Sequence, residues 1–236
     1  MKESVVKGFI GTLLVWSLLS SHGSEALTPA RHAARHPAIR FHIVRTEQWF
    51  RKHRVNVLLA YPVVTGLPNP SVQVEVNQLL RDAYPPGGLA AYLRPQVTTL
   101  DPGEGIHLDG TSSVKLLRGH IMSVYYEGMD YLTRHGKFIG AYPNNLYSSV
   151  TVDLRAGRVV HLRDLFRRSD WRKKLDNLIV REVHRTVPEL DTASIREAVA
   201  AHRYNFYLTS DNLHIFNIFD VHALSGAQVD ISRRAL

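Results

Sequence analysis

The sequence predicts an α+β fold in which an antiparallel or mixed β-sheet packs with two or three helices. Runs of apolar and β-branched residues dominate the middle of the chain, and two stretches repeat apolar residues every three to four positions. These elements alternate too irregularly for a doubly wound parallel sheet. The chain has 236 residues, of which 44% are hydrophobic, and this is enough to bury a substantial core.

The first 26 residues have the pattern of a signal peptide. Lys2 and Lys7 supply positive charge, residues 9–19 are apolar, and Ser24-Glu25-Ala26 places small residues where a signal peptidase cuts. The apolar run is shorter than the roughly 20 residues of a membrane-spanning helix, although an uncleaved anchor stays open as the alternative. We therefore expect an extracytoplasmic protein, either secreted or associated with the cell wall.

Composition narrows the chemistry. The chain has no cysteine, which excludes disulfides, iron–sulfur clusters, thiolate catalysis, zinc-thiolate sites and a lipoprotein anchor. No cofactor is expected. The net charge of +8 favours electrostatic association with anionic envelope polymers, and nucleic acid is not the natural partner of an exported chain.

A basic segment precedes the predicted domain. Residues 30–54 hold seven Lys and Arg but only one acidic residue, Glu47. We interpret 27–53 as a linker or tail and 54–236 as the folded domain. A division of that domain into two subdomains, 54–112 and 113–236, is left open.

Within the first half of the domain, residues 55–61 read as a strand that Pro62 stops. A helix over 72–83 follows, because its apolar residues recur on one face. Glycine, aspartate and proline between 93 and 113 suggest a long loop. Further strands are expected at 114–126, 131–139, 146–154 and 159–162.

The second half begins with a helix capped by Ser169 or Asp170, and a shorter helix starts near Asp191. Two strands, 204–209 and 213–219, are joined by Ser210-Asp211-Asn212, whose residue types suit a tight turn. A last short strand is expected at 229–231.

Three groups of landmarks carry a family resemblance. They are Tyr61-Pro62, Gly66-Leu67, Gln73 and Asn77; Gly140-Ala141-Tyr142-Pro143, Asp153-Leu154, Gly157, Leu162 and Asp164-Leu165-Phe166; and Phe206-Tyr207-Leu208-Thr209, Asp211, Leu213 and Gly226. In this order they resemble the RsiV-like extracytoplasmic domains (DUF3298, with a DUF4163-type N-terminal half), over roughly residues 55–231.

That resemblance implies a non-catalytic, envelope-associated role. The family includes the lysozyme-sensing outer domain of an anti-sigma factor and a domain attached to peptidoglycan deacetylases. Binding of a cell-wall glycan or of an extracellular protein such as lysozyme is therefore implied. Tyr142 departs from the histidine usual at its position in the family.

Aromatic residues suggest where a ligand would bind. Exposed tyrosines beside amides and basic groups suit stacking on sugar rings or docking a protein. The alternative is that alternate tyrosines lie in the core. The candidate binding residues are Tyr125, Tyr126, Tyr131, Arg134, His135, Tyr142, Asn144, Asn145 and Tyr147.

Other readings remain beside this one, although no catalytic or metal-binding residue is assigned. A metal-dependent hydrolase would use His120, His135, Asp153 and His161, with Glu127 or Asp130 as the base. A glycosidase would pair carboxylates among Asp101, Glu104 and Asp109. Ser112-Ser113-Val114-Lys115 and Ser210-Asp211-Asn212 match two signatures of penicillin-binding enzymes, but the third, K-T-G, is absent. A purely structural envelope protein also fits.

Overall fold

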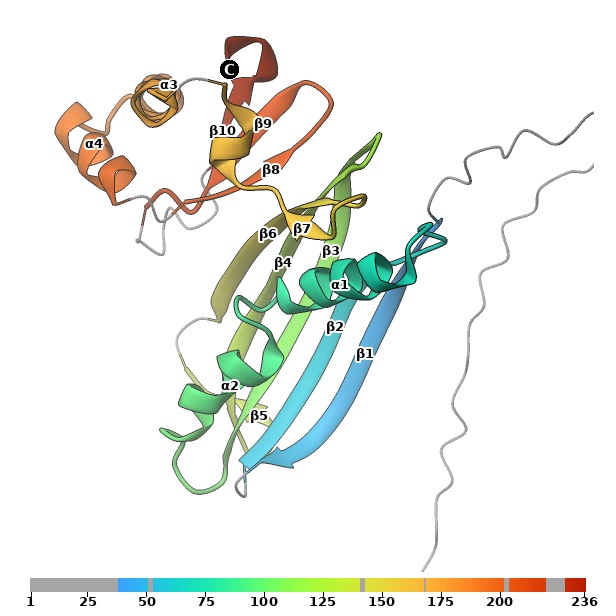
Figure 1. The fold of residues 1–236 in the computed structure, drawn as a ribbon. Coiled ribbons are helices and arrows are strands. Elements are labelled where there is room, and N and C mark those ends of the chain that lie inside the picture. Colours follow the sequence, from blue (N-terminus) through green and yellow to red (C-terminus); the bar gives the residue numbers. More distant parts are fainter. Residues whose placement is uncertain (1–37, 51–52, 141–142, 168, 202–203, 220–227) are drawn as a thin grey trace, which may run out of the picture. The chain divides into compact units, whose positions relative to one another are not determined.

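The computed structural model describes residues 38–50, 53–140, 143–167, 169–201, 204–219 and 228–236. The predicted signal peptide, 1–26, lies outside these residues. In the described part, two β-sheets and four α-helices confirm the α+β class (Figure 1). None of the helices described there combines the length and the apolarity that crossing a membrane requires.

A seven-stranded sheet forms the larger part of the fold. Its order is β1-β2-β3-β4-β6-β7, with β5 paired to β4, and all neighbours are antiparallel except β2 and β3. Its strands are β1 (Ala38–Phe50), β2 (His53–Thr65), β3 (Glu104–Arg118), β4 (Ile121–Arg134), β5 (Lys137–Phe138), β6 (Asn144–Asp153) and β7 (Arg158–Val159).

Strand β1 corrects the expectation of a basic tail over 27–53. Residues 38–50 pair with β2 along their whole length, from Ala38 opposite Thr65 to Phe50 opposite His53. Only two of the seven basic residues counted in 30–54, Arg40 and Arg45, fall within β1. From Ala38 to Phe50, the segment interpreted as a tail therefore belongs to the sheet.

Helices α1 (Pro70–Asp82) and α2 (Leu89–Val97) cover one face of the large sheet (Figure 1). Alternate residues of the strands point to that face, as the twofold period of a strand requires. The first core contains Val55, Val57, Leu59, Val64, Val76, Leu80, Tyr84, Val97, Ile106, Leu108, Met122, Val124, Tyr126, Val150, Val152 and Leu154.

Side-chain hydrogen bonds fix α1 on the sheet. Asn69 caps the helix by accepting the amide protons of Ser71 and Val72. Asn77 bonds both main-chain groups of Val64, at 2.8 and 2.9 Å. Gln73 accepts the amide proton of Leu67 at 3.2 Å. Gln73 and Asn77 are among the residues that carry the family resemblance, and their role here is to hold the fold.

The second core lies between two helices and a three-stranded sheet ordered β10-β9-β8. The elements are α3 (Trp171–Thr186), α4 (Thr192–Ala200), β8 (Asn205–Leu208), β9 (Asn212–Phe216) and β10 (Gln228–Ser232), flanked by short 3₁₀ turns η1 (Leu162–Leu165) and η3 (Arg233–Ala235). Leu175, Ile179, Ile195, Leu213 and Ile215 are fully buried there. Both predicted helices and the predicted hairpin at Ser210-Asp211-Asn212 are confirmed.

Several strand and loop assignments were wrong. Pro62 does not stop the first strand, because β2 continues through it to Thr65. The expected long loop at 93–113 is mostly the end of α2 and the start of β3. Gly119, at φ 61°, turns the chain inside the expected strand 114–126. His135 and Gly136, at φ 52° and 77°, turn it inside 131–139, and positive φ at both central residues is what a tight hairpin needs. The open subdomain boundary at 112/113 falls in the middle of β3.

Candidate functional site

The face of the large sheet opposite α1 and α2, here called the outer face, presents a row of side chains from β4. Val124 and Tyr126 point into the first core, so Tyr125, Glu127, Met129 and Tyr131 point the other way. From Tyr125 to Tyr131 this row is about 20 Å long at the usual rise of a strand.

Aromatic rings gather at one end of this row. The ring of Tyr125 stacks with that of Tyr147 at 6.4 Å and lies 5.1 Å from Tyr207 and 5.3 Å from Phe216. The ammonium of Lys115 lies 5.2 Å from the centre of the Tyr125 ring, within the range of a cation–π contact. Burial raises the pKa of Tyr125 well above its ordinary value, so its hydroxyl stays protonated near neutral pH.

A second aromatic group lies at the other end of the row. Tyr131 stacks on His107 at 4.7 Å and meets Phe138 edge-on at 5.3 Å. Phe138 is 48% exposed and Met129, between the two groups, is 36% exposed. The outer face thus carries solvent-accessible apolar surface along β4 and β5.

The structure divides the predicted binding residues into several groups. Tyr125, Tyr131 and Tyr147 share the outer face, and Asn145 pairs in register with Met129 beside them. Asn144 and Asn145 are exposed at the start of β6. Tyr142 lies outside the described residues.

Tyr126 is a core residue, which corrects its assignment to the binding set. Its side chain is fully buried and its hydroxyl donates to the carbonyl of Leu80 at 2.7 Å. The twofold period of β4 sends Tyr126 to the face opposite Tyr125.

Arg134 is the last residue of β4, and His135 begins the turn that follows. Arg134 donates to Glu104 at 2.8 Å, and Glu104 also accepts the amide proton of Asp101. These interactions, the amide first, hold the pKa of Glu104 below its ordinary value. A glycosidase acid needs the opposite shift, so Glu104 is suited to closing a turn.

The histidines proposed for a hydrolase do not form a metal site in the part of the chain that the structure describes, where no three His, Cys, Asp or Glu side chains are placed to share an ion. His120 lies 3.8 Å from Asp153. At the start of η1 the Asp164 carboxylate accepts the amide proton of His161 at 3.0 Å. Asp130 is buried under α2, where the hydroxyl of Tyr92 donates to it at 2.5 Å.

The serine-enzyme motif is also not assembled. The Ser112 hydroxyl donates to the carbonyl of Ala60 at 2.7 Å, while Lys115 lies over the tyrosine rings of the outer face. Asn212 of the other motif closes the β8–β9 hairpin with Thr209. A chain of hydrogen bonds does link Thr209, His214 and Asp230, but these residues line none of the cavities described below.

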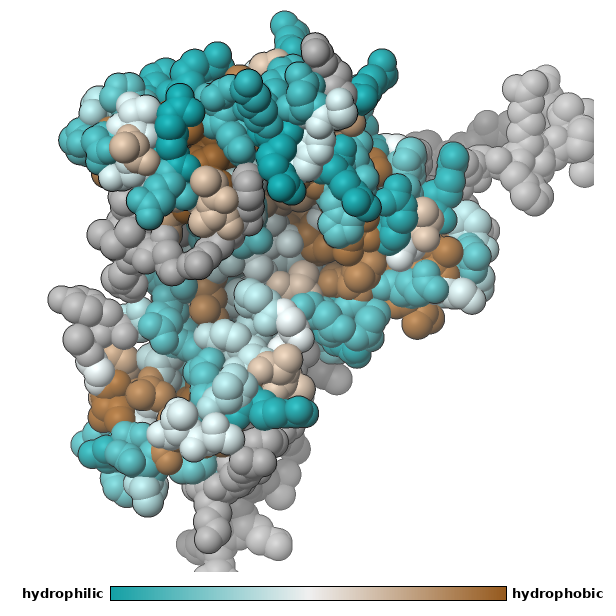
Figure 2. Space-filling view, turned by 60° about the vertical axis from the view of Figure 1, so that its left-hand side comes forward, coloured by the Kyte–Doolittle hydropathy of each residue, from teal (hydrophilic) through white to brown (hydrophobic). Residues whose placement is uncertain are grey.

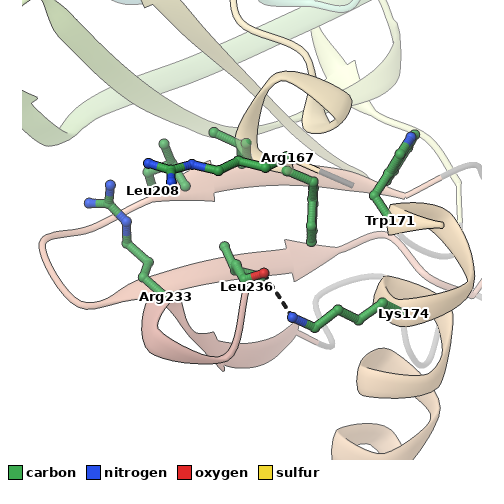
Figure 3. Close-up of a pocket in the computed structure, with 8 residues that line it drawn as sticks. Arg167, Trp171, Lys174, Leu208, Arg233 and Leu236 are labelled. Atoms are coloured by element: carbon green, nitrogen blue, oxygen red, sulfur yellow. Dashed lines mark hydrogen bonds between the residues drawn. The ribbon is translucent and has the colours of Figure 1, made fainter. Parts of the chain in front are cut away.

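Sequence reasoning missed a cavity of about 410 Å³ beside the second core (Figure 3). Its walls are Leu165, Phe166, Arg167, Trp171, Lys174, Leu208, Arg233 and Leu236. An adjoining cavity of about 300 Å³ shares Leu165, Leu208 and Arg233 with it. The sequence signal that could have indicated this cavity is an excess of positive charge, since residues 155–185 include ten Lys and Arg but only four Asp and Glu.

Comparison with known proteins supports the fold. No protein-family model matches the sequence, and no curated protein matches it either. Two solved structures are similar: a DUF3298 family member from Bacteroides fragilis, with a TM-score of 0.56, and a DUF3298 family protein from Pseudomonas aeruginosa, with a TM-score of 0.54. Each is 14% identical to this chain and covers 84% of it, and the match spans 91% and 93% of their chains, respectively. The resemblance to DUF3298 is therefore confirmed at the level of the fold.

Proposed function

We propose that this chain is a non-catalytic binding domain of the cell envelope that recognises a cell-wall glycan on the outer face. The observation that carries the proposal is the stacked pair Tyr125 and Tyr147, with Lys115 against the Tyr125 ring. Half-buried aromatic rings with polar tips suit a ligand that has apolar faces and many hydroxyls, as a sugar does.

Polar groups beside the rings support a glycan. Asn145, in register with Met129 on the outer face, offers an amide donor and an acceptor, and Glu127 lies in register with Tyr147. Asn144 lies opposite Asp130, which is buried under α2, so its side chain belongs to the other face of the sheet. The side chains of Asn145 and Glu127 are exposed, so they exchange water for sugar hydroxyls without first breaking contacts in the core. The aromatic groups at both ends of the row provide for more than one sugar unit along β4.

An extracytoplasmic location is part of the proposal. It is supported by the signal-peptide pattern of residues 1–26, and the excess of basic residues suits retention on anionic wall polymers. Attraction between exposed charges is screened at a Debye length of about 8 Å near physiological salt, and more strongly as the salt concentration rises. Binding that survives high salt is therefore distinguished from retention by charge alone.

The experiment is co-sedimentation of the protein from Leu27 onward with peptidoglycan sacculi, at low and at high salt. We expect retention that survives high salt in the parent protein and a binding constant about two- to tenfold weaker in Tyr147→Ala, since a stacked aromatic contact contributes about 0.5–1.5 kcal/mol beyond its buried area. Tyr61→Ala is the matched control, because Tyr61 is a half-buried tyrosine packed against the first core.

Three results would overturn the proposal. Retention that disappears at high salt would mean attraction by charge alone. Saturable binding of lysozyme in calorimetry, with no retention on sacculi, would instead assign the outer face to a protein partner. An equal loss of retention on sacculi in Tyr147→Ala and Tyr61→Ala would show that the stacked pair does not bind the glycan.

A further inference from the structure

We infer that the two adjoining cavities beside the second core form a separate binding groove for an organic anion, that is, a small molecule or polymer unit that carries a carboxylate or a phosphate. The groove is distinct from the outer face, because none of its lining residues belongs to the Tyr125 or Tyr131 aromatic groups. This groove is called the cationic groove below.

The larger cavity combines an apolar wall with a basic rim. Phe166 and Trp171 stack at 5.6 Å and, with Leu165 and Leu208, form the apolar wall. In Figure 3 the guanidinium groups of Arg167 and Arg233 lie at the end away from Trp171, and Lys174 reaches from α3 to donate to a main-chain oxygen of Leu236 at 2.8 Å. Its volume of about 410 Å³ falls within the ordinary range of small-molecule sites, about 300–1,000 Å³.

Arg233 joins the two cavities and is held in place. One of its guanidinium nitrogens donates to the carbonyls of Thr209 and Ser210, both at 3.3 Å. A guanidinium has five N–H donors in a rigid fork, so others remain for a ligand. Main-chain carbonyls orient this cation without neutralising it, which is the arrangement expected of an anion-binding arginine.

The charges along the groove are mostly uncompensated. Among the residues that the structure describes, Arg118, Arg167 and Arg233 form no ion pair, whereas Arg158 pairs with Asp164 at 3.2 Å. His120 lies 3.8 Å from Asp153. Two carboxylate side chains, Asp153 and Asp164, therefore face five Lys and Arg side chains, of which Lys174 also bonds the main-chain oxygen of Leu236. Figure 2 shows hydrophilic side chains over most of the surface where α3 and α4 lie.

This combination defines the ligand by its chemistry. The apolar wall favours a ligand with hydrocarbon surface that it can cover. A guanidinium group favours a carboxylate or a phosphate, which it binds through two parallel hydrogen bonds. Such a group is available from a free metabolite or from the anionic repeat of an envelope polymer, and the test separates these sources.

The test is calorimetry on the full chain from Leu27 onward with three probes. N-acetylmuramic acid carries a carboxylate, N-acetylglucosamine 1-phosphate carries a phosphate, and N-acetylglucosamine is the neutral sugar. We expect saturable binding of at least one anionic probe and none of the neutral sugar. Co-sedimentation with sacculi at high salt, in competition with the bound probe, separates a polymer repeat from a free molecule.

Arg167→Gln and Arg233→Gln each should weaken probe binding by about tenfold or more, because a hydrogen bond to a charged group is lost. Arg167 makes no hydrogen bond in the described residues, so its replacement leaves the fold intact even if Arg233→Gln does not. Arg196→Gln, on the exposed face of α4, removes the same charge outside the groove and should bind normally.

Equal binding of the neutral and anionic sugars, or equal losses in Arg167→Gln and Arg196→Gln, would overturn the inference. If Tyr147→Ala binds sacculi as well as the parent protein does, the outer-face proposal fails, but the inference about the cationic groove is not affected. A loss confined to the arginine variants would support the cationic groove even where the outer face proposal fails.

Discussion

The hydroxyl oxygen of Ser123 accepts the amide proton of Leu208 at 2.9 Å, and this bond joins β4 of the large sheet to β8 of the small one. Ser123 is fully buried and its hydroxyl also lies 2.8 Å from that of Thr151. A second bond, from the Ser149 hydroxyl to the carbonyl of Phe206, crosses the same junction. Polar side chains of the large sheet thus replace the missing neighbour of an edge strand.

Ser123→Ala should lower the free energy of unfolding by about 1–3 kcal/mol, because it leaves the buried amide of Leu208 without an acceptor. Urea denaturation measures this loss. Ser113→Ala, on β3, is the control, since the Ser113 hydroxyl makes no hydrogen bond between the two sheets within the part of the chain that the structure describes. Equal effects of the two substitutions would contradict the role given to Ser123.

Tyr126→Phe should reduce stability by about 1 kcal/mol without altering ligand binding. The substitution removes the bond from the buried hydroxyl to the Leu80 carbonyl but keeps the ring in the first core. Thermal unfolding and sacculus co-sedimentation provide the two measurements. A binding defect in a fully folded Tyr126→Phe protein would show that this residue acts at the outer face after all.

Gly128→Ala should destabilise the large sheet by about 1–3 kcal/mol through overpacking. A methyl group at Gly128 would overlap three atoms: the Tyr84 hydroxyl oxygen, the Asp109 carbonyl oxygen to which that hydroxyl donates at 2.9 Å, and the Cα of Gly110. Tyr84→Phe removes one of these three obstacles. In a double-mutant cycle the combined loss should therefore be smaller than the sum of the single losses, and strict additivity would argue against the overlap.

Asp191 links the stability of α4 to pH. It caps the helix by accepting hydrogen bonds from the hydroxyl and the amide of Ser194, and these hold its pKa below the ordinary value of 3.8. The ionised form is therefore the stabilising one. Its contribution is present above pH 3.8 and is lost as the pH falls through the lowered pKa.

Asp191→Ala should accordingly lower the melting temperature at neutral pH, and its difference from the parent protein should shrink below about pH 4. Asp191→Asn is the matched variant, because asparagine caps a helix without a charge. It should keep most of the stability at neutral pH and lose the acid dependence. A gap between the parent and Asp191→Ala that stays constant from pH 7 to pH 3 would be inconsistent with this role.

Local patterns were sufficient where the interactions are local. The apolar period of 72–83 and the residues after Asp170 and Asp191 predicted three helices, because caps and helix faces depend on neighbours within a few positions. Helix α2 was missed, since it follows four turn-forming residues, Pro85 to Gly88, and contains Pro95.

Strand assignments depended on tertiary contacts. β1 was assigned to a tail because its charges suggested solvation, and only pairing with β2 makes it part of the sheet. The turns at Gly119 and at His135-Gly136 divide two runs whose other residues are mostly strand-forming types. Propensity describes each residue, whereas a strand requires a partner at a set register.

The sequence by itself determined the α+β class, the basic and cysteine-free chemistry, and the order of landmarks that the DUF3298 fold bears out. Only the tertiary structure decided that Tyr125 faces outward while Tyr126 is buried, and that Arg167 and Arg233, 66 residues apart in the chain, line one cavity. The physical reason is that alternation along a strand distinguishes two faces but does not say which one the helices cover. Long-range packing makes that choice, and it also brings distant cations to one groove.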